Sequence, residues 1–349
     1  MNHLVIMAGG VGSRFWPMST EENPKQFIDV LGVGRSLLQL TYDRFKDICS
    51  PDNVWVVTSA AYVEKVREQL PEMPACNILS EPCRRNTAPC IAYVSHRIKA
   101  KDSKANIVVT PSDHVVMNIA EFQRVVKEAL LFTSESDAIL TLGIKPSRPE
   151  TGYGYIEADM SMATMSNKDI FRVNSFKEKP DFATAQEYVS HNYYYWNAGI
   201  FVWNVSTVVN AFRMYQPALN DIFESMAEYF GTDKEQEIIN ERYAECENIS
   251  VDYAIMEKAE EIYVFPADFG WSDLGTWGSL HTLSKKDSNN NALIGENIKT
   301  FETSNCLINV KDAEKVVVQG LDGYIVAERD GRLLICKLSE EQRIKEFSR

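Results

Sequence analysis

The segment AGGVGSRFWPMSTEENPKQF (8–27) places glycines directly after a short apolar run, LVIMA (4–8). Gly9, Gly10 and Gly12 have no side chain, so their backbone N–H groups can approach a phosphate chain closely. The segment has neither the G-x-G-x-x-G spacing of a dinucleotide-binding turn nor the GKS or GKT of a Walker A loop. The glycines alone therefore fit a phosphate-binding loop and an ordinary tight turn equally well.

Two basic residues, Arg14 and Lys25, add positive charge to the same segment. With them, the whole string closely resembles GGxGxR(L/F)WPxSxxxxPKQF, the opening of the mannose-1-phosphate guanylyltransferases within the sugar nucleotidylyltransferase superfamily. Further strings in chain order extend this resemblance over residues 1–280: EPCRRNTAP (81–89), PSDH (111–114), RPETGYGYIE (148–157), FKEKPD (176–181), YWNAGIFVW (195–203), SVDYAIMEK (250–258) and FGWSDLGTW (269–277).

The resemblance implies an enzyme that transfers GMP from GTP to α-D-mannose 1-phosphate, giving GDP-mannose and pyrophosphate. A sugar-phosphate oxygen would attack the α-phosphorus in line, so the protein would mainly position the substrates and neutralise charge. The expected cofactor is Mg²⁺ or Mn²⁺. The expected partners are the two substrates and two products, without nucleic acid or membrane, and the compact members of the family suggest a homodimer.

The resemblance also assigns roles to residues of this chain. Arg14 and Lys25 would hold the triphosphate, Asp113 and Asp273 would hold the metal ion, and Lys179 would bind the sugar phosphate; these five are the expected catalytic residues. The expected nucleotide-binding residues are Ala8, Gly9, Gly10, Gly12, Arg14, Lys25, Glu81, Asn86, Thr87 and Asp113. The expected sugar-phosphate-binding residues are Gly152, Gly154, Glu178, Lys179, Asn197 and Asp252.

Several of these residues also have plainer interpretations. Asp113 and Asp273 could be turn residues, and Asp252 could cap the helix that follows it. In a strand, Glu178 and Lys179 would point to opposite faces, so a bend at Pro180 would be needed to aim both at one site. The plainer interpretation of this pair is a salt-bridged EKPD turn at the surface.

The resemblance implies that Glu81 selects the base, since a carboxylate can accept hydrogen bonds from guanine N1–H and N2–H₂ together. Adenine does not offer that pair of donors. One alternative is a nucleotidylyltransferase for another base or sugar, of the GDP-heptose, UDP-glucose or dTDP-glucose type. Another is a non-catalytic relative that binds a nucleotide sugar and regulates a partner, although the expected cations and carboxylates are all present.

Alternating elements should position these residues. From residue 4 to about 145, β-branched runs alternate with helical patterns, which predicts a Rossmann-like, doubly wound α/β sheet. The expected strands are 4–8, 53–59, 77–81, 106–113 and 138–144. Residues 150–282, with strand patterns in GYGYIEA, VNSFKEKPD and AGIFVWNV, are expected to continue the same domain and make its sheet mixed.

The polar segment KKDSNNN (285–291) is the best candidate for a linker. We therefore expect a catalytic domain over 1–284 and a small β-rich domain over 292–349, which resembles the abbreviated β-helix of compact family members. The spacing in SEEQ (339–342) predicts a capping box that opens a terminal helix. Some family members continue into an isomerase domain, which the 349 residues of this sequence are not expected to include.

Composition limits the class of protein. The formal net charge is -13, with 36 Lys plus Arg and 49 Asp plus Glu, which disfavours nucleic acid and anionic membranes as partners. The 7 cysteines form no CxxC pair, so they are expected to be reduced thiols. With no signal peptide or long apolar run, the expected compartment is the cytoplasm.

Overall fold

The structure is a computed structural model that describes residues 1–311 and 313–348; Asp312 and Arg349, which fall in the predicted small domain, lie outside the described residues. The chain forms two compact units. The first unit contains Met1–Gly9, Tyr42–Ser112 and Val116–Trp271. The second unit contains Gly10–Thr41, Asp113–Val115 and Ser272–Arg349. The glycine-rich opening segment therefore belongs with the C-terminal strands, although it lies far from them in sequence.

The first unit is built on one mixed sheet of 9 strands in the order β3-β2-β1-β4-β9-β6-β10-β8-β7. Its strands are β1 (Asn2–Met7), β2 (Val54–Ser59), β3 (Ile78–Glu81), β4 (Asn106–Pro111), β6 (Ile139–Ile144), β7 (Tyr155–Ala163), β8 (Phe171–Lys177), β9 (Tyr194–Asn204) and β10 (Ile262–Ala267). β1 to β4 are parallel, whereas β9 pairs antiparallel with both β4 and β6. The five predicted early strands are confirmed, but β9 separates the fifth from the others.

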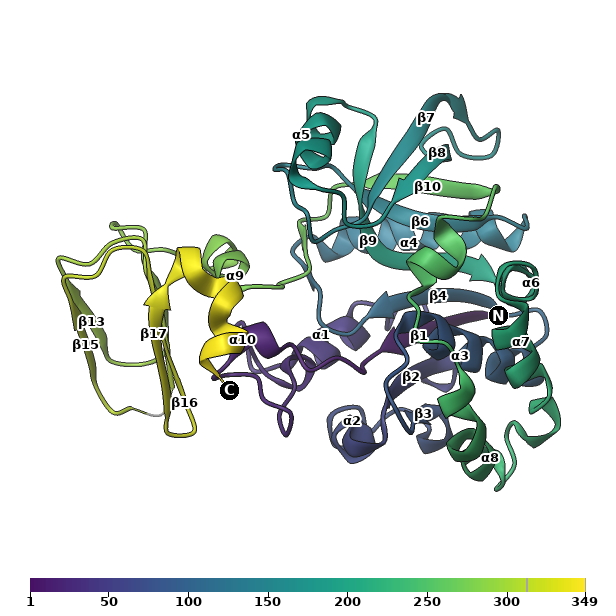
Figure 1. The fold of residues 1–349 in the computed structure, drawn as a ribbon, viewed down its shortest axis with the longest axis horizontal. Helices are drawn as coiled ribbons and strands as arrows, with labels where there is room; N and C mark the ends of the chain where they lie inside the picture. The colour runs from purple at the N-terminus through teal and green to yellow at the C-terminus, as the bar shows by residue number, and fades with distance from the viewer. Residues whose placement is uncertain (312, 349) are drawn as a thin grey trace. The chain divides into compact units, whose positions relative to one another are not determined.

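Helices cover both faces of this sheet (Figure 1). They are α2 (Val63–Gln69), α3 (Thr87–Lys101), α4 (Ile119–Ser134), α5 (Phe182–Ser190), α6 (Val205–Tyr215), α7 (Pro217–Glu224) and α8 (Glu235–Arg242), while α1 (Leu37–Asp43) lies where the chain leaves the second unit for the first. Alternate residues of β4 point to the two faces of the sheet. Ile107 and Val109 join the core cluster formed with α3 and α6, whereas Asn106 donates to the carbonyl of Leu130 in α4 at 2.6 Å.

The second unit stacks short strands in parallel ladders. β12 (Ala292–Ile294), β14 (Leu307–Val310) and β16 (Tyr324–Arg329) pair in parallel, as do β13 (Ile298–Phe301) and β15 (Val316–Gln319), and β17 (Arg332–Lys337) closes the larger sheet antiparallel. These ladders fit the expected β-helix-like, strand-rich tail. One face packs on Phe15, Met18 and Trp277, so the opening segment and α9 (Trp277–Leu283) share its core.

The end of the chain differs in detail from the prediction. A 3₁₀ helix, η9 (Leu338–Arg343), and the short α10 (Ile344–Phe347) follow β17, so the terminal helical segment is present. Its N-cap is Lys337, and no side chain caps it, so the capping box predicted for 339–342 is wrong. The helix begins two residues earlier than that spacing required, which removes the capping register.

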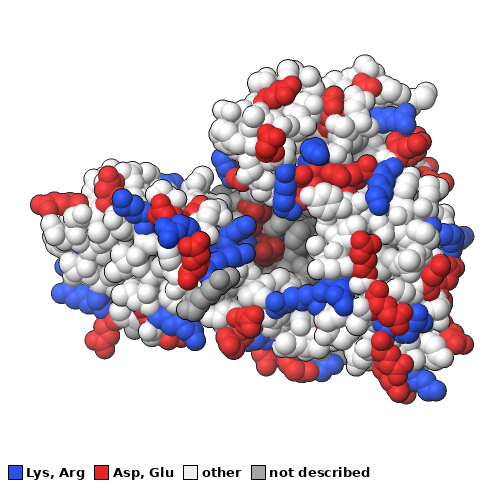
Figure 2. Space-filling model, viewed as in Figure 1, with Lys and Arg blue, Asp and Glu red and all other residues white. Residues whose placement is uncertain are grey.

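Charges of both signs are interspersed over the face shown in Figure 2. This face therefore has no continuous basic surface of the kind that binds nucleic acid. Within residues 1–311 and 313–348, no helix is both long and apolar enough to cross a bilayer. All seven cysteines are unpaired, as expected.

Candidate functional site

The glycine-rich segment of the second unit is shaped around the side chain of Lys25. Gly12 has a φ of 70° and is the N-cap of a short 3₁₀ helix, η1 (Ser13–Phe15). A Cβ on Gly12 would lie 2.5 Å from Cβ of Lys25, so a larger residue would collide with the lysine as well as strain the backbone. Gly12 is therefore required by the packing of Lys25.

Lys25 joins three distant parts of the sequence. Its side chain is only 3% exposed, and its amino group donates to Oδ2 of Asp113 at 3.0 Å and to the main-chain oxygen of Asp273 at 2.9 Å. The amino group also lies 5.5 Å from the centre of the Phe15 ring. Three of the four residues expected at the triphosphate and metal are thus brought together within the second unit.

The Asp113 carboxyl is held in its ionised form. Burial opposes ionisation, but the positive charge of Lys25, with a further effect of His114, outweighs it and lowers the pKa of Asp113 below its usual value. Asp273 accepts a hydrogen bond from the Gly275 amide at 3.0 Å through Oδ1. An ionised carboxylate next to a second carboxylate residue is a donor set that suits a hard divalent cation.

The remaining loop residues differ in their surroundings. Gln26 donates from Nε2 to the Gly10 carbonyl at 2.8 Å, which fixes the orientation of that peptide. Apart from Gly10 and its two chain neighbours, no described residue has a heavy atom within 4 Å of the place that a Cβ on Gly10 would take. Arg14 is exposed to solvent. Gly10 and Arg14 are thus open to a ligand, whereas Gly12 and Lys25 form the packed base of the loop.

In the first unit, Glu178 and Lys179 point toward each other. β8 ends at Lys177, and Lys179 has a φ of 47°, in the left-handed region that ordinary residues rarely adopt. The Lys179 amino group forms an ion pair with Oε1 of Glu178. The bend that the sequence required is present, and it lies in the backbone of Lys179 itself, immediately before Pro180.

Gly154, Asn197 and Asp252 surround this pair. A Cβ on Gly154 would lie 2.6 Å from Oε2 of Glu178 and 3.4 Å from Cβ of Asn197, so the glycine makes room for the carboxylate. Asn197 donates from Nδ2 to Oδ1 of Asp252 at 3.0 Å and accepts from the Thr141 hydroxyl at 3.0 Å. Five of the six expected sugar-phosphate residues therefore form one polar cluster.

The electrostatics of the cluster are strongly coupled. Burial, together with the charge of Glu178, raises the pKa of Asp252 to about 6. Burial opposes the charge on Lys179, but Glu178 and Asp252 outweigh it and raise its pKa. Asp252 begins a π-helical turn (Asp252–Met256) and is not its N-cap, which is Val251, so the capping interpretation of Asp252 is wrong.

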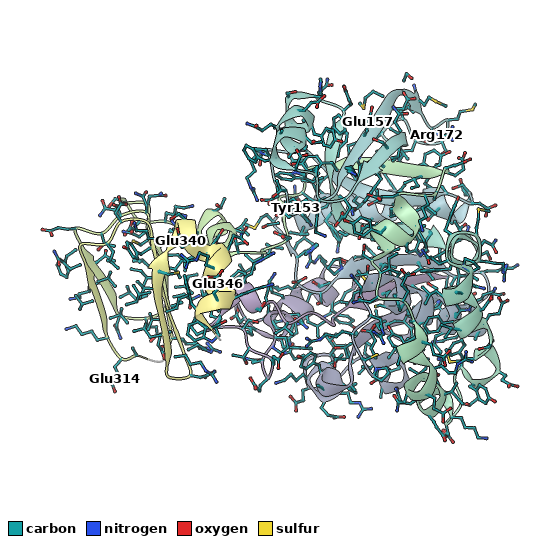
Figure 3. The ribbon with its side chains drawn as sticks, in the orientation of Figure 1. Tyr153, Glu157, Arg172, Glu314, Glu340 and Glu346 are labelled. Atoms are coloured by element: carbon teal, nitrogen blue, oxygen red, sulfur yellow. The ribbon has the colours of Figure 1, made fainter. Side chains whose placement is uncertain are left out.

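Aromatic rings adjoin the same cluster. Tyr153 makes edge contacts with Trp196 and Trp271, at 5.2 and 5.4 Å between ring centres, and its carbonyl accepts from the Lys179 amide at 3.2 Å. Figure 3 shows Tyr153 and, on the β7–β8 hairpin, Glu157 and Arg172. Gly152, the sixth expected sugar-phosphate residue, lies in an exposed turn, where its amide donates to Glu150 at 3.1 Å.

Glu81 lies at the carboxyl end of β3 and is buried. Its Oε1 accepts a hydrogen bond from the Tyr243 hydroxyl, and its Oε2 would lie 3.2 Å from a Cβ on Gly9. Burial raises the pKa of Glu81 to about 7, although the Tyr243 hydrogen bond lowers it. The carboxylate therefore adjoins the backbone of Gly9, the first glycine of the opening segment.

The other expected nucleotide residues of the first unit have structural partners. Asn86, with a φ of 66°, is the N-cap of α3 and accepts from the Thr87 amide at 2.9 Å. The Thr87 hydroxyl accepts from the Val251 amide at 2.9 Å. Ala8 continues β1, since its amide donates to Val57 at 2.8 Å and its carbonyl accepts from Thr58 at 2.9 Å. A ligand role for these three residues stays a prediction.

Sequence reasoning missed two residues of these sites. Gln26 lies inside the PKQF string, so the string already contained a signal for it. Tyr243 lies in a helical segment without a motif, and nothing local in the sequence indicated that its hydroxyl would bind Glu81.

The coupled cluster predicts a pH effect on stability. The pKa of Asp252 in the fold, about 6, exceeds its ordinary value of 3.8. Protonated Asp252 therefore adds to the free energy of unfolding below about pH 4, and this contribution is lost as the pH rises through 6. Asp252→Asn keeps an oxygen acceptor for Asn197 and removes the charge. We expect the variant to be more stable than wild type at pH 8 by roughly 1–3 kcal/mol.

Urea denaturation at pH 4 and pH 8 measures this effect. The two proteins should have similar free energies of unfolding at pH 4, where Asp252 is protonated. A variant that is equally stable or less stable than wild type at pH 8 would contradict the proposed burial of this charge.

Comparisons with known proteins show the family to which the chain belongs. Residues 3–290 match the family model described as Nucleotidyl transferase. A mannose-1-phosphate guanylyltransferase of Escherichia coli is 33% identical over 346 residues, which are 98% of this chain and 74% of the relative. The xanthan biosynthesis protein XanB of Xanthomonas campestris pv. campestris is 35% identical over 346 residues, 98% of this chain and 71% of the relative.

A solved structure is similar over almost the whole chain. It is described as a mannose-1-phosphate geranyltransferase from Thermus thermophilus, and it is 28% identical with a TM-score of 0.87, covering 99% of this chain and 98% of its own. The Rossmann-like fold and the resemblance read from the motifs are thereby confirmed. The chain belongs to the nucleotidyl transferase family.

Proposed function

We propose that this protein transfers GMP from GTP to α-D-mannose 1-phosphate, giving GDP-mannose and pyrophosphate. The observation that carries the proposal is the Lys25 amino group, which contacts the Asp113 carboxylate and the Asp273 main chain at 3.0 and 2.9 Å. Lys25 is a buried cation that hydrogen-bonds two aspartate residues next to a glycine-rich loop. This arrangement suits a triphosphate and its metal ion. The names of the curated relatives support GTP and mannose 1-phosphate as the substrates.

A divalent cation fits the residues present. Within the described ranges, 1–311 and 313–348, no group of three or more His, Cys, Asp or Glu side chains could enclose a metal ion. Asp113 and Asp273 would supply two carboxylates to such an ion, and water and phosphate oxygens would supply the other ligands. When bound, the ion would neutralise charge on the phosphates.

The other residues bind and orient the substrates. Arg14, which is exposed, would contact the departing phosphates, and the open backbone at Gly10 would let them approach. Lys179, with its left-handed backbone, would direct its amino group to the sugar phosphate, while Glu178 and Asn197 would receive sugar hydroxyls. Glu81 would accept from the guanine edge.

The expected activity is release of pyrophosphate from GTP, mannose 1-phosphate and Mg²⁺ together. A panel of GTP, ATP, UTP and dTTP with mannose, glucose and heptose 1-phosphates measures the preference as kcat/KM. We expect GTP with mannose 1-phosphate to be preferred, because Glu81 provides the acceptors that guanine needs. A clear preference for UTP or dTTP would contradict the proposal, and nucleotide-sugar binding without turnover would indicate a regulatory relative instead.

The charge roles predict large losses of turnover. We expect Lys25→Ala and Asp273→Ala each to lower kcat by about 10² or more, as removal of a positioned charge at a developing anion does. Asp273→Asn separates charge from structure, because its amide oxygen can still accept from Gly275. It should lose activity to a similar extent.

Lys127→Ala, at an exposed position on α4, is the control and should keep the wild-type rate. Circular dichroism would establish that each variant is folded. Near-normal turnover in folded Lys25→Ala or Asp273→Asn would reject these role assignments.

A further inference from the structure

Tyr243 fixes the orientation of the Glu81 carboxylate. It opens a short 3₁₀ helix, η7 (Tyr243–Glu245), directly after α8, and its side chain is fully buried. Its hydroxyl donates to Oε1 of Glu81, while Oε2 faces the backbone of Gly9. The two carboxylate oxygens therefore have different, fixed neighbours, and rotation of the carboxylate would break the Tyr243 hydrogen bond.

Two further hydrogen bonds hold the chain on either side of Glu81 to the same helical segment. Gln236 of α8 donates to the Ser80 carbonyl at 3.2 Å, and Arg85 donates to the Ala244 carbonyl at 2.7 Å. Segment 236–244 thus makes three hydrogen bonds to residues 80–85, one of which is the bond from the Tyr243 hydroxyl to Glu81. This arrangement limits movement of Glu81 relative to Gly9.

Aromatic packing holds the Tyr243 ring in turn. The ring makes edge contacts with Tyr93 at 6.4 Å and Phe223 at 6.1 Å between centres. The Tyr93 hydroxyl has a different partner, Glu235, at 3.0 Å. Tyr243 is thus the phenol of this cluster that is directed to Glu81.

We propose that Tyr243 is a positioning residue for base specificity, which acts by holding the Glu81 carboxylate in the orientation that accepts two hydrogen bonds from guanine. The proposal rests on the proposed function, in which Glu81 contacts the base. Tyr243 itself would not touch the nucleotide. Its hydrogen bond to a charged acceptor is of the strong class, so its loss should be measurable.

The charged state of Glu81 links this role to pH. The ionisable groups that face it are Tyr243 of η7 and Cys90 and Tyr93 of α3, and burial raises the pKa of each, so all three are neutral near pH 7. Burial raises the pKa of Glu81 to about 7, against the opposing effect of the Tyr243 hydroxyl. Without that hydroxyl, the pKa of Glu81 would rise further, so a larger fraction of Glu81 would be protonated near pH 7 and would have one acceptor fewer.

The test compares Tyr243→Phe with Tyr93→Phe, a matched control that removes a neighbouring hydroxyl bonded to Glu235 and not to Glu81, and keeps the ring that packs on Tyr243. The kcat/KM ratio of GTP to ATP is measured from pH 6 to pH 9. We expect Tyr243→Phe to lower this ratio about tenfold at pH 7, mainly through KM for GTP, as loss of a hydrogen bond to a charged group does. The ratio should recover toward pH 9 as Glu81 ionises, and Tyr93→Phe should follow wild type throughout.

Each other outcome would overturn the proposal. An unchanged ratio in Tyr243→Phe, or equal losses with GTP and ATP at every pH, would leave Tyr243 a merely structural residue. In a Glu81→Gln background, Tyr243→Phe should have no further effect on the ratio, and an additional fall would show that it does not act through Glu81.

Wild type supplies a readout that needs no variant. Its preference for GTP over ATP should rise with pH through about 7, the pKa of Glu81. A flat profile in an enzyme that prefers GTP would overturn the role of Tyr243 alone. A wild-type enzyme that prefers UTP or dTTP would overturn the proposed function itself.

Discussion

The second unit depends on one buried amino group. Lys25 donates to Asp113 and to the Asp273 main chain, which ties together segments that lie far apart in the sequence. A buried charge is costly unless it is paired, so this arrangement requires both partners. It also explains Gly12, whose position leaves no room for a Cβ beside the lysine. The same contacts that stabilise the loop also place a cation and an ionised carboxylate where phosphate and metal would meet.

Much of the fold could be predicted from local pattern. β-branched runs such as 53–59 and 106–113 became strands because they suit a buried parallel sheet. The antiparallel insertion of β9 between β4 and β6 could not be foreseen, because a continuous apolar strand does not specify its neighbours. The capping box failed for a local reason: Lys337, not Ser339, precedes the first helical turn.

The candidate site, like the fold, could be predicted from the sequence only in part. The family resemblance of several motif strings led us to expect Lys25, Asp113 and Asp273 at one site, and the structure places these residues in contact. Their roles, and those of Glu178 and Lys179, stay predictions. The motif strings could not supply the left-handed backbone of Lys179, which non-glycine residues seldom adopt.

The most direct test of the central claim is a crystal structure with a non-hydrolysable GTP analogue and Mg²⁺. The account predicts an ion about 2.0–2.1 Å from carboxylate oxygens of Asp113 and Asp273, with the Lys25 amino group within hydrogen-bond distance of a phosphate. A triphosphate bound away from Gly10 and Lys25, with the Lys25–Asp113 pair undisturbed and no metal on either aspartate, would contradict it.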